Sequence, residues 1–147
     1  MPKFRLHIVA IVLLLVSIFA LAGCGGGSST ANPRLTGLSP DGVVKTVFNE
    51  VQANQMNDAK QYLAPNTSGD TASIQTMKNS NLISVKTITT QGDYAVVVAT
   101  MQQQNTTNFS VKPVGLEKIN GEWYILDTNN IYNNAKYALL QKLLGNI

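Results

Sequence analysis

Residues 94–102 read "YAVVVATMQ", and this stretch decides the fold. Its β-branched and apolar residues predict a strand. Successive side chains of a strand point to opposite faces, which gives one face Tyr94, Val96, Val98 and Thr100 and the other Ala95, Val97, Ala99 and Met101. Because both faces are largely apolar, we expect a central strand that is covered on both sides.

The sequence around this strand predicts an antiparallel meander. Strand patterns occupy residues 81–90, 94–102, 108–119 and 122–127. The connections are short, as consecutive antiparallel strands require, and Asn120-Gly121 between two strand patterns is a strong hairpin signal. Pro113 and Gly115 lie inside the third run and indicate a bulge or an edge position that would bend the sheet.

A helix is predicted to begin after Ser39, which suits an N-cap, with Pro40 at the first helical position and Asp41 complementing the helix dipole. Apolar residues then recur on one side of this helix at Val43, Val44, Val47, Phe48 and Val51. Residues 57–65 predict a second short helix that stops before Pro65 and turns Ala59, Tyr62 and Leu63 inward. A third helical turn is expected around residues 74–77. These helices can cover only one face of the sheet.

The last segment, residues 129–147, has a helical pattern with Asn129 or Asn130 as its cap. It carries apolar residues on two sides, more than a surface helix needs: Ile131, Ala135, Leu139 and Leu143 on one, and Tyr137, Leu140 and Leu144 on the other. Three interpretations therefore remain for the second face of the sheet. It lines a pocket, meets a partner, or is closed by this segment.

The N-terminus has the three parts of an export signal. Lys3 and Arg5 give a positive start, residues 8–22 are apolar, and small residues follow. As a helix, the apolar stretch would be about 22 Å long, against about 30 Å of bilayer hydrocarbon. It is short for a retained transmembrane anchor, although including the two preceding residues narrows the gap.

Leu21, Ala22, Gly23 and Cys24 follow the apolar stretch directly, and this segment resembles the lipobox of bacterial lipoproteins. The resemblance implies that Cys24 becomes linked to diacylglycerol and is the mature N-terminus. Two acyl chains suffice for stable anchoring, so the membrane is the first expected partner, at the extracytoplasmic face. The alternative is an ordinary signal peptide that leaves Cys24 as a free thiol. Cys24 is the sole cysteine, so it cannot form an intramolecular disulfide.

Three regions follow: a signal peptide over residues 1–23, the lipidated cysteine with a Gly/Ser tether over residues 24–38, and an α+β domain over residues 39–147. The tether composition predicts a flexible coil with an end-to-end distance of roughly 20 Å. Of the eleven Lys and Arg residues, two lie in the leader, which leaves nine against eight Asp and Glu. This balance, with its scattered cations, excludes a nucleic-acid-binding surface.

The order of helix, short helix, loop and antiparallel meander resembles the nuclear transport factor 2-like superfamily. A branch of domains carried on bacterial lipoproteins matches more closely, at Ser39, Pro40, Asp41, Phe48, Ala59, Leu63, Gly121, Trp123 and Ile125. The resemblance implies N-terminal helices packed on a curved four-stranded sheet in a cone. The break at residues 54–56 departs from the pattern of that branch, and the helix after Asp127 is an extension to it.

The superfamily includes enzymes, so the inventory of catalytic residues matters. The single histidine, His7, lies in the leader. A mature chain without histidine lacks the usual zinc ligands and the most common acid-base residue, and we expect no metal and no cofactor. Alternation places Asp127 on the same face as Trp123 and Ile125, so these three are the candidate pocket residues. Asp127 is then either a desolvated base or the cap of the segment that follows it.

Trp123 is expected to serve core packing more than ligand stacking, and Tyr124 to cover an outer surface. Asp93, Glu117 and Glu122 adjoin hairpin turns and are expected to be solvated. The sequence therefore favours a membrane-anchored, non-catalytic binding or interaction module. Its partner would be an envelope protein, a small ligand or a second copy of the chain. The alternatives are a small-molecule enzyme or sequestering pocket, and a structural subunit that docks through its C-terminal helix.

Overall fold

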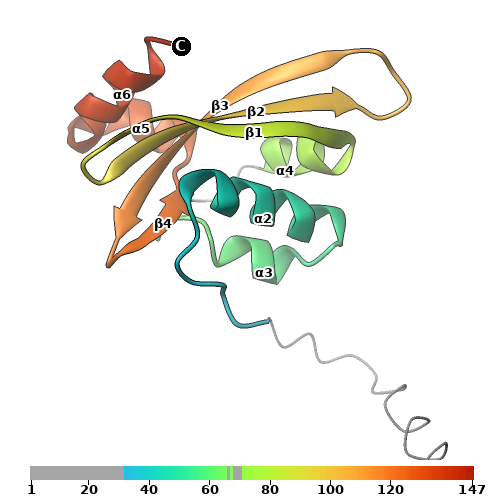
Figure 1. Cartoon of the computed structure of the whole chain (residues 1–147), viewed down its shortest axis with the longest axis horizontal. Helices are drawn as coiled ribbons and strands as arrows, with labels where there is room; N and C mark the ends of the chain where they lie inside the picture. The colour runs from blue at the N-terminus through green and yellow to red at the C-terminus, as the bar shows by residue number, and fades with distance from the viewer. Residues whose placement is uncertain (1–31, 66, 68–70) are drawn as a thin grey trace, which may run out of the picture. The chain divides into compact units, whose positions relative to one another are not determined.

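The computed structural model describes residues 32–65, 67 and 71–147, and it has an α+β fold with one antiparallel sheet (Figure 1). Its strands, in spatial order, are β1 (Ser80–Gln91), β2 (Tyr94–Gln103), β3 (Phe109–Ile119) and β4 (Glu122–Ile125). The predicted four-stranded meander is confirmed, and β2 is an interior strand. Within the described residues, no helix has the length and apolar character needed to span a bilayer.

The turns and edges of the sheet follow from a few residues. Asn120 and Gly121 both have positive φ, 51° and 87°, as a two-residue type I′ hairpin requires. Pairing with β4 involves only the last four residues of β3, so Pro113 lies on a stretch of β3 that β4 leaves unpaired, where its missing N–H costs no ladder bond. The edge position is confirmed. The register shifts lie in β1 and not in β3, so of the two alternatives for Pro113 and Gly115 the bulge does not apply.

Helix α2 (Pro40–Gln52) begins as its sequence predicts. The Ser39 hydroxyl accepts a hydrogen bond from the N–H of Gly42 at 3.3 Å, and Thr87 of β1 donates one to the Asp41 carboxylate at 3.0 Å. The apolar side of α2 shares a core cluster with the β2 face of Ala95, Val97 and Ala99. Helices α3 (Met56–Lys60) and α4 (Thr71–Lys78) lie on the same side of the sheet as α2 (Figure 1).

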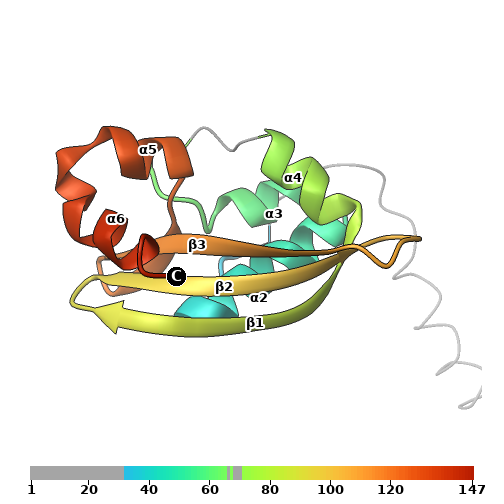
Figure 2. The same ribbon diagram turned by 90° about the horizontal axis from the view of Figure 1, so that it is seen from above.

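The C-terminal segment lies on the opposite face of the sheet, at one end of β2 and β3 (Figures 1 and 2). It consists of α5 (Thr128–Asn133), the 3₁₀ turn η2 (Ala135–Tyr137) and α6 (Ala138–Leu144). Its buried residues form a second core cluster with Val96 of β2, namely Ile131, Tyr137 and Leu140. The second face of the sheet could line a pocket, meet a partner or be closed by the final segment. At this end of β2 and β3, the final segment closes it.

Two expectations about this segment are corrected. It is not one helix, because Asn134 has extended backbone and its side chain accepts a hydrogen bond from the N–H of Lys136, which starts a new turn. The cap of α5 is Asp127, and neither Asn129 nor Asn130 fills that role. The segment can approach the sheet closely because Gly115 has no side chain: a Cβ there would come within 2.7 Å of Ile131 Cδ1 and 3.0 Å of Leu140 Cδ2.

Glu117 was expected to be solvated, but it is buried, with 7% of its surface exposed. It lies on the β3 face that the C-terminal segment covers. Its carboxylate accepts a hydrogen bond from Tyr137 at 3.1 Å and pairs with the Lys136 ammonium at 2.6 Å. Hydrogen bonding to Glu117 raises the pKa of Lys136, while burial and then the Glu117 charge raise the pKa of Tyr137. This polar cluster fastens η2 to the sheet.

We expect Gly115→Ala to lower the free energy of unfolding by about 1–3 kcal/mol, because the new methyl group overpacks two fully buried side chains. Urea denaturation monitored by circular dichroism measures this loss. The control is Gly145→Ala, where the nearest atom to the new methyl lies at 3.4 Å and φ is negative. An effect as small at Gly115 as at Gly145 would show that α5 and α6 do not rest on the backbone of β3.

Candidate functional site

A pocket of about 420 Å³ lies between the helices and the sheet. Small-molecule sites in proteins usually have volumes of roughly 300–1,000 Å³. Its apolar wall comes from α2, α3, α4 and the strands β2, β3 and β4 with the residue that follows β4: Val44, Val47, Phe48, Val51, Met56, Ala59, Leu63, Met77, Ala99, Met101, Val114, Ile125 and Leu126. The short side chain of Ala99 on β2 leaves room there, where a larger residue would fill the space between α2 and the sheet.

Methionine is concentrated at this pocket. The chain has four methionines, and apart from Met1 all of them line the pocket: Met56 from α3, Met77 from α4 and Met101 from β2. Methionine is unbranched and polarizable, so it adapts to the shape of what it contacts and recurs at surfaces that accept varied apolar ligands. The wall is therefore deformable on three sides.

The charged lining residues are Lys60, Lys112 and Asp127 among those that the structure describes. Lys60 and Lys112 are exposed, and neither forms an ion pair with a described residue. Lys112 lies opposite Ala99 in the β2–β3 register, on the same strand face as the buried core. Long lysine side chains can lie along apolar surface while their ammonium groups stay in water, so we expect both ammonium groups at the rim of the pocket.

The three candidate pocket residues separate in the structure. Ile125 and Asp127 line the pocket, whereas Trp123 is absent from its described lining. Trp123 is buried in the helix-side core with 7% of its surface exposed, and the Lys118 ammonium lies 5.5 Å from its ring centroid. Tyr124 packs against the second core cluster. Trp123 therefore serves core packing, as expected. Of the three candidate residues, Ile125 and Asp127 line the pocket.

Asp127 is the N-cap of α5. Its Oδ1 accepts a hydrogen bond from the N–H of Asn129 at 2.9 Å, and its carbonyl accepts the first helical bond, from Ile131 at 3.0 Å. The capping alternative is therefore the one that the geometry supports. A carboxylate at this position also suits the positive end of the helix dipole.

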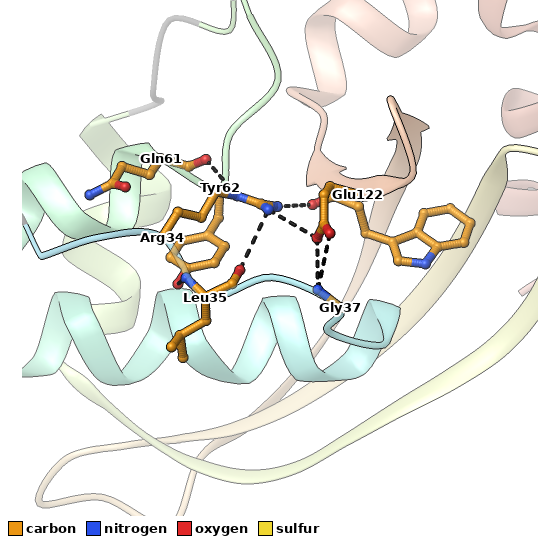
Figure 3. Close-up of polar contacts among 7 residues, drawn as sticks. Arg34, Leu35, Gly37, Gln61, Tyr62 and Glu122 are labelled. Carbon is orange, nitrogen blue, oxygen red and sulfur yellow. Dashed lines mark hydrogen bonds and ion pairs between the residues drawn. The ribbon is translucent and has the colours of Figure 1, made fainter.

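Residues 32–38 form a strap that is bound to the domain, and Arg34 is its centre (Figure 3). The guanidinium donates to the carbonyls of Gln61 at 3.1 Å and Trp123 at 2.7 Å, and it pairs with Glu122 at 3.1 Å. Its carbon also lies 4.9 Å from the ring centroid of Tyr62 and 4.4 Å from that of Tyr124. Such contacts are cation–π interactions, and the arginine thereby joins the end of α3 to β4.

Both ends of the strap are also fixed. At its start, the Asn32 N–H and side-chain amide donate to the two carboxylate oxygens of Asp58, at 2.8 and 2.7 Å. Further along, the N–H of Gly37 donates to both carboxylate oxygens of Glu122 at 3.0 Å. Two expectations change as a result: residues 32–38, assigned to the flexible tether, belong to the domain, and Glu122 is a bonded residue and not a freely solvated one.

The strap and the pocket share α3. Asp58, Gln61 and Tyr62 bind the strap, whereas Met56, Ala59 and Leu63, in and directly after the same short helix, line the pocket. A helix of five residues has little stability of its own. The strap contacts therefore help to hold one wall of the pocket in place.

The lipidation residue Cys24 and the lipobox residues Leu21, Ala22 and Gly23 lie outside the described residues. Comparison of the sequence with models of protein families and with curated protein sequences gives no match. Within the described part of the chain, no group of three or more His, Cys, Asp or Glu side chains is placed to hold a metal ion.

We expect Asp127→Ala to lower the free energy of unfolding by about 0.5–2 kcal/mol, the usual range for loss of an N-cap. Asp127→Ser should restore most of this loss, because serine also accepts the hydrogen bond from Asn129. Thermal or urea unfolding of the two variants measures the difference. Equal destabilisation by alanine and serine would contradict the capping role.

We expect the strap to be pH-sensitive. Hydrogen bonding from Gly37 and then from Arg34 lowers the pKa of Glu122 below its ordinary value of 4.5. The contribution of the charged form is present above that value and is lost as the pH falls through the lower pKa of the folded state. Glu122→Gln should therefore be less stable than the native chain at pH 7, and the difference should shrink from pH 4.5 downward.

Urea unfolding at a series of pH values from 7 to 3 measures this effect. A double-mutant cycle with Arg34→Gln should give a coupling free energy that is largest at pH 7 and disappears at the acidic end. A stability difference that stayed constant across this range would show that the charge of Glu122 does not hold the strap.

Proposed function

We propose that the chain is a bacterial lipoprotein, anchored through diacylglycerol on Cys24 at the extracytoplasmic face of the membrane. We further propose that its domain is a nuclear transport factor 2-like cone that acts as a non-catalytic binding module. The sheet with helices on one face, and a pocket between the two, supports the assignment of the cone. The lipobox and the apolar leader support the anchor.

The observation that carries the binding function is the pocket itself. Its wall is apolar, deformable at three methionines and large enough for a small organic molecule. The one acidic residue in its described lining, Asp127, caps a helix. The lining therefore offers surface for holding a ligand, and the one acidic candidate base among its described residues has a structural role.

The alternative of an enzyme in the same pocket would make Asp127 its base, and the capping contact argues against it. The alternative of a structural subunit that docks through the C-terminal helix is weakened by burial. Ile131, Tyr137 and Leu140 face the second core cluster, so the strongest apolar residues of that segment are already used within the domain. Deleting the segment would expose Val96, which is fully buried. A loss of partner binding in such a variant would therefore reflect unfolding as much as the loss of a docking surface.

The anchor is tested by Cys24→Ala in a bacterial host. We expect the native chain to incorporate a radiolabelled or alkyne-tagged fatty acid and to fractionate with membranes. The variant should lose the label and keep its leader, because Cys24 supplies the sulfur atom of the thioether. Ser28→Ala, a few residues downstream, is the matched control and should label normally. Labelling of the Cys24→Ala variant would contradict the proposal.

A further inference from the structure

We propose that the pocket takes a ligand with an apolar body and a single anionic end group, a carboxylate or a phosphate, with Lys112 and Lys60 as the residues that select the charge. This inference rests on the proposed binding function of the pocket and names the chemical class of its ligand. It is carried by the placement of the charges around a mostly apolar lining, whose other polar residues are Thr67, Thr76, Thr128 and Asn129.

The buried part of the pocket suits the apolar portion of such a ligand. Val44, Val47 and Val51 of α2 and Ala99 and Met101 of β2 are buried residues that also line it. These side chains offer no hydrogen-bond partner, so a polar group placed among them would lose its hydration without compensation. An aliphatic or aromatic group, in contrast, gains from leaving water.

The rim suits an anionic end group. Lys60 on α3 and Lys112 on β3 approach from different walls, and both are exposed and lack an ion-pair partner among the described residues. Asp127 is the only acidic member of the described lining, and its Oδ1 is already bonded at the start of α5. The described lining thus has an excess of positive charge at the edge of an apolar wall.

Lys112 is the more informative of the two lysines. Its neighbours on the same strand face are Val114 on β3 and Ala99 across the β2–β3 register, and both belong to or pack against the helix-side core. Folding alone would favour an apolar residue at such a position. We expect the stem of Lys112 to follow the wall and its ammonium group to reach the rim, where it would pair with the negatively charged end of a ligand.

The methionines provide the probe, because the domain has three and all of them line the pocket. The full chain, labelled with ¹³C at the methionine methyl groups and reconstituted in phosphatidylcholine nanodiscs, is titrated with four compounds of equal chain length. Octanoate and octyl phosphate carry the two anionic groups, octanol is neutral, and octyltrimethylammonium is cationic. Single Met→Leu variants assign the resonances of Met56, Met77 and Met101.

We expect saturable shifts of these resonances with at least one anion, weaker binding of octanol and the weakest binding of the cation. Lys112→Gln keeps most of the stem and removes the charge, so it should weaken binding of the anion by about five- to tenfold and leave octanol unchanged. Lys60→Gln should act in the same direction. Lys45→Gln, at an exposed position on α2 outside the described lining, is the control and should have no effect.

Each result has a distinct meaning. Binding of octanoate alone supports a carboxylate ligand, and binding of octyl phosphate alone supports a phosphate ligand. Equal binding of anion and cation, or unchanged anion affinity in Lys112→Gln, overturns the charge selection while the binding function stands. If none of the four compounds shifts the three methyl resonances, the proposed binding function of this pocket fails as well.

Discussion

The burial of both faces of β2 is the constraint on which the rest of the structure depends. Ala95, Val96 and Val97 are fully buried although consecutive side chains point in opposite directions. One sheet face therefore needs α2 and the other needs the C-terminal segment. The close approach at Gly115 and the Glu117–Tyr137–Lys136 cluster both follow from this second requirement, because they allow and then fasten the cover over Val96.

The same strand shows why the pocket lies on the helix side. β2 presents Ala95 and Ala99 to α2, and small side chains cannot fill the space between a helix and a curved sheet. On the other face, the C-terminal segment approaches the backbone of β3 at Gly115, where an added Cβ would lie within 3.0 Å of Ile131 and Leu140. The small residues on the helix side of β2 thus help to leave space for the pocket.

Much of this architecture could be predicted from the sequence, because local patterns determine it. Alternation located the four strands, Asn120-Gly121 fixed one hairpin, and Ser39 with Pro40 marked the start of α2. The remainder depended on contacts between distant residues. The Arg34 and Glu122 pair is separated by 88 positions, and an arginine within a Gly/Ser-rich stretch carries no signal of its partner. The burial of Glu117 and the break at Asn134 likewise reflect how the last segment fits the sheet.

The candidate site was predicted in part. Alternation predicts a pocket position for Ile125 and Asp127, but it predicts the same for Trp123, which packs in the core. It gives no signal for the lysines and methionines of the lining. A count of methionines could have suggested a deformable apolar surface. It could not have shown that residues from α3, α4 and β2 converge, since that convergence comes from the tertiary fold.

The strap would have a mechanical consequence if the chain were held through Cys24, as proposed above. The span from Cys24 to Asn32 covers eight residues and reaches at most about 28 Å when fully extended. A pull along it would first load the Asn32–Asp58 bonds and then the Arg34 contacts to α3 and β4, before any force reached α2. Under the proposed anchoring, a force applied at Cys24 would therefore act on the strap contacts at the edge of the domain before it acted on the core that covers β2.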